Sequence, residues 1–383
     1  MLQCTSCRKT YPQEKKVQRC ECGEPLELEL QSGKFQKGET TWERFRDFYP
    51  FDFNLDFSLG EGNTPLSKAH TLSEELDVEL YIKNETTNPT WSFKDRGTFV
   101  GIHRAIELEF DEIGTVSSGN MAESVATFGK RFGLDTLIFV GADLITEEKI
   151  TPIAIHGPRL IKVIGDYGEL YFKTLELGKE KNIYFINSDA PFRIEGYKTI
   201  SFEIVEKLVP DYVFIPNSSG GLFRGVTKGF RELVKNEIIE EMPTLVAVQA
   251  KGCSPTFRAF KEGNDTIAHF DNPHTVAHAI ANPYPPSGNA VLREVKQHSG
   301  LVVAVVDDEI LKVQREMARD GIFAQPAGCV GVAALRNLRE KHGVEKNSKV
   351  VALATGAGFK FLSGVKGVKG AETVKLENIQ EVF

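Results

Sequence analysis

The segment Asn88-Pro89-Thr90-Trp91-Ser92-Phe93-Lys94-Asp95-Arg96-Gly97 joins an apolar run to a stretch with helical periodicity. The run Glu79–Lys83 has the length of a buried strand, and Asp95–Glu109 has the spacing of an amphipathic helix. The segment therefore predicts a strand-turn-helix unit with Lys94 at the start of the helix. Partial desolvation there disfavours the ammonium form, so a neutral amine becomes available for covalent chemistry. Taken alone, the motif favours the alternative of a surface lysine.

Apolar runs and helical stretches alternate along most of the chain. This pattern predicts an α/β architecture with parallel sheets, helices on both faces, and two lobes with a cleft between them. Further strands are expected at Glu112–Val116, Thr136–Val140, Arg159–Val163, Ile183–Ile186, Tyr212–Ile215, Thr244–Gln249 and Val350–Ala354. Further helices are expected at Ala122–Phe132, Asp166–Lys181, Tyr197–Leu208, Leu222–Val234 and Asp307–Asp320.

Composition narrows the class of protein. The 383 residues are 41% hydrophobic, which is typical of a folded globular protein and excludes disorder. The 46 Lys and Arg against 53 Asp and Glu give a net charge of -7, so no basic field favours a nucleic-acid partner. No apolar run reaches the roughly 18 residues of a membrane span, and no basic-then-apolar leader follows Met1. The sequence predicts a cytoplasmic protein that acts on small molecules.

Four of the six cysteines, Cys4, Cys7, Cys20 and Cys22, lie within the first 22 positions. Their spacing, C-x2-C and then C-x-C, suits two corners that face one metal ion, and zinc is expected in a structural site. We therefore expect residues 1–32 to form a small zinc-ribbon-like unit, because so short a segment folds poorly without such a clip. A redox or disordered remnant and a nucleic-acid-reading finger are the alternatives.

Three polar turns follow predicted strands. The turn Ser117-Ser118-Gly119-Asn120 offers hydroxyls, an amide and free backbone N–H groups, which suit a carboxylate or a phenolic oxygen. The turn Pro216-Asn217-Ser218-Ser219-Gly220-Gly221-Leu222 has the composition of an anion nest for a phosphate monoester. In Thr355-Gly356-Ala357-Gly358 a hydroxyl follows a strand, where ligands of open α/β sheets bind. A helix cap or a ligand-free tight turn is the alternative in each case.

Taken in order, these motifs resemble the fold-type II family of pyridoxal-phosphate enzymes, and within it the threonine synthases. The likeness runs through Gly62–Leu66, Asn88–Gly97, Ser117–Asn120, Asn187–Thr199, Gly220-Gly221, Val248–Ala250, Pro326-Ala327 and Thr355–Gly358. It implies a large cofactor-binding domain of residues 33–97 and 206–383, a small domain of residues 98–205, and a homodimer.

The resemblance also implies roles for individual residues. Lys94 would hold pyridoxal 5'-phosphate covalently and later move protons, while Asn120 and Thr355 would contact the cofactor ring. The cofactor phosphate would lie on Ser218, Ser219, Gly220, Gly221 and Leu222. The substrate, a phosphorylated amino acid, would be bound by Ser117, Ser118, Asn187, Ser188 and Arg193, although Arg193 and Glu195 could instead form a surface charge pair.

The expected reaction converts O-phospho-L-homoserine and water to L-threonine and phosphate. The alternatives are β-replacement or elimination on a smaller amino acid, as in cysteate synthase, phosphoserine sulfhydrylase or serine/threonine dehydratases, and a catalytically silent binding protein on the same fold. The residues that depart from the family pattern are Trp91, Met121, Glu123, Asp189, Ala190, Gln325 and Ala357. Two of them, Glu123 and Asp189, add charges that would repel a nearby phosphate.

Overall fold

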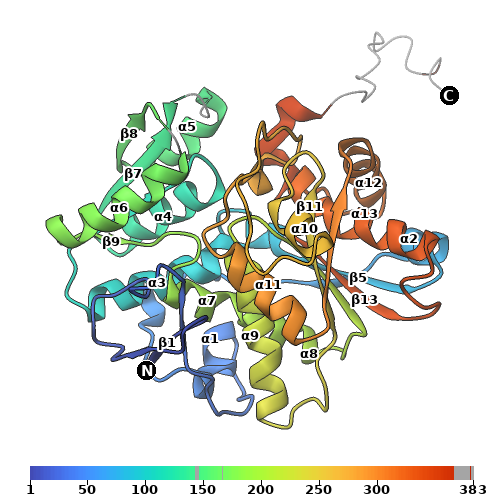
Figure 1. The fold of residues 1–383 in the computed structure, drawn as a ribbon, viewed down its shortest axis with the longest axis horizontal. Helices are drawn as coiled ribbons and strands as arrows, with labels where there is room; N and C mark the ends of the chain where they lie inside the picture. The colour runs from blue at the N-terminus through green and yellow to red at the C-terminus, as the bar shows by residue number, and fades with distance from the viewer. Residues whose placement is uncertain (143–145, 166, 366–379, 381–383) are drawn as a thin grey trace.

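The computed structural model describes residues 1–142, 146–165, 167–365 and 380. Their strands form three sheets of three, six and four strands. Figure 1 shows the four-stranded sheet and its helices on one side of the molecule, the six-stranded sheet on the other, and the N-terminal segment beneath them. None of the described helices combines the length and apolar character that a bilayer-spanning segment requires.

The six-stranded sheet has the order β12-β11-β10-β13-β5-β4, and only the edge strand β4 runs antiparallel to its neighbour. Side chains alternate between two hydrophobic clusters: Val213 and Ile215 of β10 belong to one, and Phe214 belongs to the other. Both faces are therefore buried, as parallel sheets require. The strands are β4 (Leu66–Lys68), β5 (Glu79–Asn84), β10 (Tyr212–Pro216), β11 (Thr244–Ala250), β12 (Leu301–Val305) and β13 (Lys349–Ala354).

Helices cover both faces of this sheet, and together they form the large lobe. One face packs against α2 (His70–Leu76), α12 (Asp307–Arg319) and α13 (Pro326–Glu340). The other face packs against α8 (Thr199–Val205), α9 (Gly221–Lys235) and α11 (Gly288–Gln297). The short helix α10 (Pro255–Lys261) lies beside α11.

The four-stranded sheet and its helices form the small lobe. Its order is β8-β7-β6-β9, and all pairs are parallel. On β7, Ile138 and Val140 face α4 and α5, whereas Leu137 and Phe139 face the side of α6. The elements are β6 (Glu112–Val116), α4 (Asn120–Arg131), β7 (Asp135–Gly141), α5 (Glu147–Ala154), β8 (Arg159–Val163), α6 (Tyr167–Lys181) and β9 (Tyr184–Phe185).

Two helices and the N-terminal segment join the lobes. The helices are α3 (Lys94–Glu107) and α7 (Pro191–Tyr197), which pack on each other. The N-terminal sheet contains β1 (Leu2–Cys4), β2 (Thr10–Tyr11) and β3 (Leu26–Leu28). Its buried side chains share one hydrophobic cluster with α3, α7, α9 and the aromatic segment around α1 (Thr41–Arg44). The N-terminal sheet is thus packed into the body of the protein.

Most predicted elements are confirmed, and β6 and β8 have the predicted bounds. The helix predicted at Tyr197–Leu208 is wrong in its bounds, because two short helices, α7 and α8, meet at Lys198. Residue 166, the predicted start of α6, lies outside the described residues. The strands β1–β4 and β12 and the helices α1, α2, α5, α7, α10, α11 and α13 were not predicted.

Candidate active site

Lys94 is the first residue of α3, as predicted, and its side chain is partly buried. The preceding turn is fixed by Asp95, whose carboxylate accepts hydrogen bonds from the Thr90 N–H (2.7 Å) and the Thr90 hydroxyl (2.6 Å). Trp91 adopts a φ of 59°, in the region that favours glycine. The hydrogen bonds of the turn therefore hold Trp91 in a strained backbone conformation. Strained backbone of this kind is common at functional sites.

The electrostatic environment favours the neutral amine of Lys94. Burial, with a smaller contribution from the positive charge of Arg193, lowers the pKa of Lys94 to about 7. The Nζ atom lies 4.4 Å from the ring centroid of Phe93. A lysine with this pKa supplies a nucleophilic amine and a proton acceptor near neutral pH.

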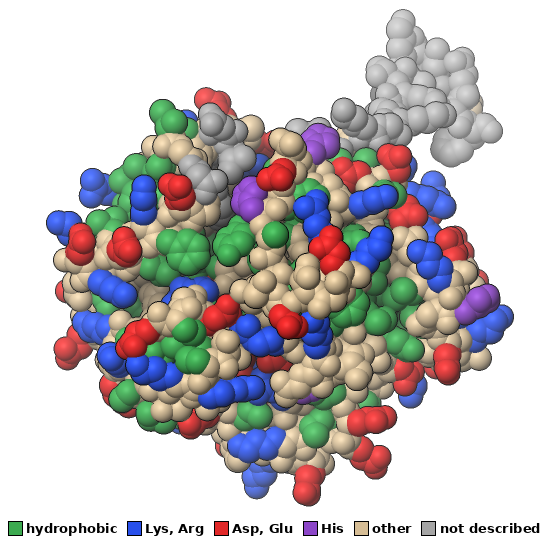
Figure 2. All heavy atoms as spheres, in the orientation of Figure 1, with side chains coloured by type: hydrophobic (Ala, Val, Ile, Leu, Met, Phe, Trp, Pro, Cys, Tyr) green, Lys and Arg blue, Asp and Glu red, His purple; other side chains and the backbone are tan. Residues whose placement is uncertain are grey.

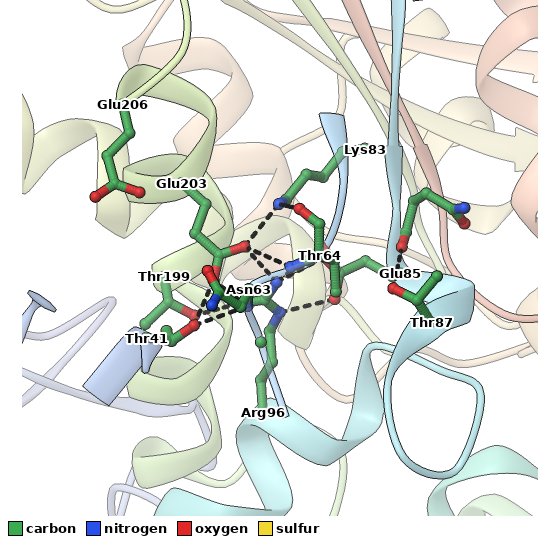
Figure 3. Close-up of polar contacts among 12 residues, drawn as sticks. Thr41, Asn63, Thr64, Lys83, Glu85, Thr87, Arg96, Thr199, Glu203 and Glu206 are labelled. Atoms are coloured by element: carbon green, nitrogen blue, oxygen red, sulfur yellow. Dashed lines mark hydrogen bonds and ion pairs between the residues drawn. The ribbon is translucent and has the colours of Figure 1, made fainter. Parts of the chain in front are cut away.

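A buried ionic network lies directly behind this turn (Figure 3). The guanidinium of Arg96 donates to Glu85 at 2.7 Å and to Glu203 at 2.7 Å, and Lys83 also pairs with Glu203, at 2.6 Å. Burial alone would raise the pKa of Glu203, but the charges of Arg96 and Lys83 hold this pKa well below its usual value. The network ties the start of α3 to β5 and α8, so Lys94 rests on a rigid support.

Thr355 and Asn120 both lie close to the Lys94 turn. Thr355 is buried at the end of β13, and its carbonyl accepts from the Phe93 N–H at 3.1 Å. Asn120, the first residue of α4, donates to the Gln325 side chain at 3.3 Å across the boundary between the lobes. The structure thus brings Lys94, Thr355 and Asn120 together, and it adds Gln325, which sequence reasoning had noted only as a departure from the family pattern.

The glycine turn follows β10. This strand lies next to β13 and runs parallel to it, so the carboxyl ends of the two strands meet at one edge of the large sheet. Gly220 has a φ of +94°, and α9 begins at Gly221. A Cβ atom on Gly221 would lie 2.1 Å from the Ser188 carbonyl oxygen. The turn and the segment that contains Ser188 are therefore in direct contact, and no side chain fits between them.

Ser188 and Ser219 line one pocket at this edge. Its other walls come from the small lobe and from residues 282–286, and they include Met121, Tyr171 and Pro286. Figure 2 shows hydrophobic side chains gathered in the hollow between the two lobes. Within the described part of the chain, Ser92 Oγ in the Lys94 turn, Asn187 Nδ2 next to Ser188 and Asn217 Oδ1 in the glycine turn are buried without a hydrogen-bond partner. Such atoms are rare in folded proteins and are consistent with a polar ligand.

The other predicted substrate residues divide into two groups. Ser117 and Ser118 are half-buried after β6, and Asn187 accepts from the Val116 N–H at 3.1 Å, which joins the β6 and β9 ends. Arg193 is fully buried, so the alternative of a surface charge pair is wrong. Its guanidinium donates to Tyr197 (2.6 Å), Thr98 (2.9 Å) and the Lys94 carbonyl (3.1 Å). Arg193 therefore braces the Lys94 helix from behind, and its contact with a substrate phosphate stays a prediction.

Both acidic departures from the family pattern are paired with cations. Glu123 forms an ion pair with Lys360 at 2.6 Å, and Asp189 forms one with Arg19 at 2.6 Å. The repulsion of a phosphate expected from these residues is therefore largely cancelled. Neither cation could be predicted, because Lys360 and Arg19 are far from their partners in sequence.

The four N-terminal cysteines converge as predicted. All four sulfur atoms lie within 4.8 Å of one another, with Cys4 and Cys22 at 3.5 Å and Cys7 and Cys20 at 3.6 Å. Tetrahedral zinc with Zn–S bonds of about 2.3 Å separates its sulfurs by about 3.8 Å. The donor set therefore fits this metal. Cys253 and Cys329 are buried elsewhere.

Comparison with known proteins shows the family of the chain. Residues 57–356 match the family described as "Pyridoxal-phosphate dependent enzyme". The chain belongs to this pyridoxal-phosphate dependent enzyme family. Curated members of the family with high similarity include the threonine synthase of Methanocaldococcus jannaschii, which is 36% identical over 376 residues, 94% of this chain and 93% of that protein. The threonine synthase of Methanosarcina acetivorans is 34% identical over 85% of this chain and 82% of its own length.

Solved structures of other proteins share the fold. The processed form of threonine deaminase isoform 2 from Solanum lycopersicum superposes with a TM-score of 0.68 at 26% identity, over 79% of this chain and 85% of that one. Maize serine racemase superposes with a TM-score of 0.67 at 20% identity, over 84% and 91% of the two chains. The fold-type II architecture expected from the sequence is thus confirmed.

The residues present fit the family's cofactor. Gly220 and Gly221 form a cradle that a Cβ atom would fill, and the unpartnered buried Oδ1 atom of Asn217 belongs to the same turn. Lys94, with its lowered pKa, is the amine at this site. Ser92, Asn217 and Gln325 adjoin it without having been predicted. Only Ser92 and Asn217 carried a usable signal, because they lie within the predicted turns.

Proposed function

We propose that the protein catalyses the threonine synthase reaction, in which O-phospho-L-homoserine and water give L-threonine and phosphate. The observation that carries this proposal is the pKa of about 7 of the Lys94 amine, in a turn whose Phe93 N–H donates to the Thr355 carbonyl. Relatives named threonine synthase at 30–36% identity support the choice of reaction.

Different residues of the chain would bind the cofactor, transfer protons and orient the cofactor ring. Pyridoxal phosphate supplies the electron sink that stabilises a carbanion on the substrate. Lys94 would hold the cofactor and then take and return protons at the α and β carbons, a task suited to its lowered pKa. The turn Ser218–Leu222 would bind the cofactor phosphate through backbone N–H groups at the start of α9. Asn120 and Thr355 would orient the ring.

The substrate side of the site is also part of the proposal. Ser117, Ser118, Asn187 and Ser188 lie at the ends of β6 and β9 and would bind the phosphorylated amino acid. We further propose zinc in the cysteine cluster, a large domain of residues 33–97 and 206–383, and a small domain of residues 98–205. Strand membership supports this division, because β4, β5 and β10–β13 form one sheet and β6–β9 form the other. The helix α8, which lies within residues 98–205, instead packs on the large sheet. A homodimer and a cytoplasmic location remain predictions.

The test combines spectroscopy with turnover. The purified protein and its Lys94→Ala variant are scanned for visible absorption and then assayed for phosphate and threonine from O-phospho-L-homoserine. Absorption in the native protein alone, with both products formed, supports the proposal. Normal turnover by Lys94→Ala would refute the role of this lysine.

Elimination or β-replacement on a smaller amino acid is the second candidate. The observation that favours it is the superposition on threonine deaminase at 26% identity. Visible absorption without turnover of O-phospho-L-homoserine, but with turnover of phosphoserine, serine or threonine, would select it. No absorption after addition of pyridoxal phosphate would instead favour a silent binding protein.

A further inference from the structure

Asp189 lies directly behind the glycine turn, Ser218–Leu222. The neighbouring Ser188 carbonyl contacts Gly221, and the Asp189 carboxylate accepts from the Ser287 hydroxyl at 3.0 Å. The Ser287 N–H in turn donates to the Ser219 carbonyl at 3.0 Å. The Asp189 side chain is only 1% exposed. An uncompensated negative charge at this depth would be costly and would weaken phosphate binding at the turn.

The compensating cation comes from the N-terminal ribbon. Arg19 pairs with Asp189 at 2.6 Å, and its side chain is 12% exposed. Its second terminal nitrogen donates to the Pro286 carbonyl at 2.8 Å, in the wall of the pocket. Tyr171, another pocket residue, also donates to Asp189. A second buried cation, Arg224, donates to the Ser287 hydroxyl at 3.2 Å, and its charge also acts on Asp189, although no hydrogen bond between the two is found in the described part of the chain.

The position of Arg19 depends on the cysteine cluster. Arg19 immediately precedes Cys20, and its Nε donates to the Gly23 carbonyl at 2.8 Å. The Gly23 N–H donates to the Cys20 carbonyl at 2.9 Å, which closes the corner that carries two of the four thiols. The side chain is therefore anchored to the corner that a metal would hold in shape.

We propose that Arg19 is a positioning residue of the active site, which neutralises Asp189 so that the glycine turn can bind the cofactor phosphate. This inference rests on the proposed function. It makes the ribbon a part of the active-site wall, and it couples metal in the cysteine cluster to cofactor affinity.

The test measures the dissociation constant of pyridoxal phosphate for the full chain by visible absorption, after removal of bound cofactor. Arg19→Ala should weaken binding by about tenfold or more. The double variant Arg19→Ala/Asp189→Asn should bind within about threefold of the native protein, because it removes the stranded charge. The matched control is Lys9→Ala, since Lys9 pairs with Glu21 at the same 2.6 Å but at 49% and 71% exposure. This control should bind like the native protein.

Native-like affinity of Arg19→Ala would overturn the proposal. Equal weakness of the single and double variants would also overturn it, since a purely structural role of Arg19 predicts that result. If Arg19→Ala fails to fold, the same comparison is made with Arg19→Gln. Removal of the metal should weaken cofactor binding in the native protein but not further in Arg19→Ala; an equal loss in both refutes the coupling. If the native protein binds no pyridoxal phosphate, the proposed function is refuted together with this inference. If the native protein and Arg19→Ala bind pyridoxal phosphate with the same affinity, only this inference is refuted.

Discussion

The lowered pKa of Lys94 predicts how fast the cofactor-free protein captures pyridoxal phosphate at different pH values. With a pKa of about 7, about half of the amine is neutral at pH 7. A lysine with the ordinary pKa of 10.5 would be neutral in only about 0.03% of molecules. The structure therefore predicts a reactive fraction at pH 7 about three orders of magnitude larger than that of an exposed lysine.

The assay follows the visible absorption of lysine-bound cofactor by stopped flow between pH 5.5 and pH 10. Protonation removes the nucleophile, so the rate should fall about tenfold per pH unit below pH 7 and level off above it. Arg193→Gln should move the midpoint to higher pH, because a positive charge that disfavours the ammonium is lost. A rate that keeps rising through pH 9 in the native protein would refute the assignment of a desolvated lysine.

Further predictions concern the glycine turn, the buried network and the ribbon. Gly221→Ala should abolish cofactor binding in a dialysis assay, because its Cβ would lie 2.1 Å from the Ser188 carbonyl oxygen. Binding equal to that of Gly343→Ala, whose Cβ would come no closer than 3.3 Å to Leu338, would contradict this. Glu203→Gln should lower stability by about 3–5 kcal/mol in chemical unfolding, since it strands buried cations, whereas Asp265→Asn, at an exposed ion pair of equal length, should cost less than about 1 kcal/mol. Metal analysis should find one zinc per chain, lost in Cys4→Ser. Chelation should expose four thiols to a thiol reagent and leave Cys329 unreactive, because burial raises the pKa of this thiol.

Local sequence patterns predicted the elements that carry the site but not the contacts between them. The strand-turn-helix units around Lys94, Asn120 and the glycine turn could be placed because each combines an apolar run with turn residues and a helical period. The strand Leu301–Val305 has the same apolar signal and could have been predicted from it. The helix Pro326–Glu340 has ten buried residues in succession, so it shows no amphipathic stripe.

Contacts between residues that are far apart in the sequence could not be predicted from local patterns. The ion pair between Arg19 and Asp189 joins residues 170 positions apart, and the fold alone brings them together. The same holds for the pairing of Glu123 with Lys360 and for the burial of Arg193 under Lys94. The sequence therefore indicated two acidic residues, Glu123 and Asp189, near the proposed phosphate site, but it did not indicate the cations that neutralise them.

The docking of the N-terminal sheet has a consequence for synthesis on the ribosome. The Leu26 carbonyl is bonded by Arg224, 198 residues later in the chain, and the Leu28 carbonyl is bonded by Lys228, 200 residues later. At a synthesis rate of about 5–20 residues per second, roughly 10–40 s pass between synthesis of the sheet and synthesis of these partners. During that interval its own core is too small to hold it together. A metal ion captured at once by the four cysteines would preserve the sheet until the helix that receives it has been made.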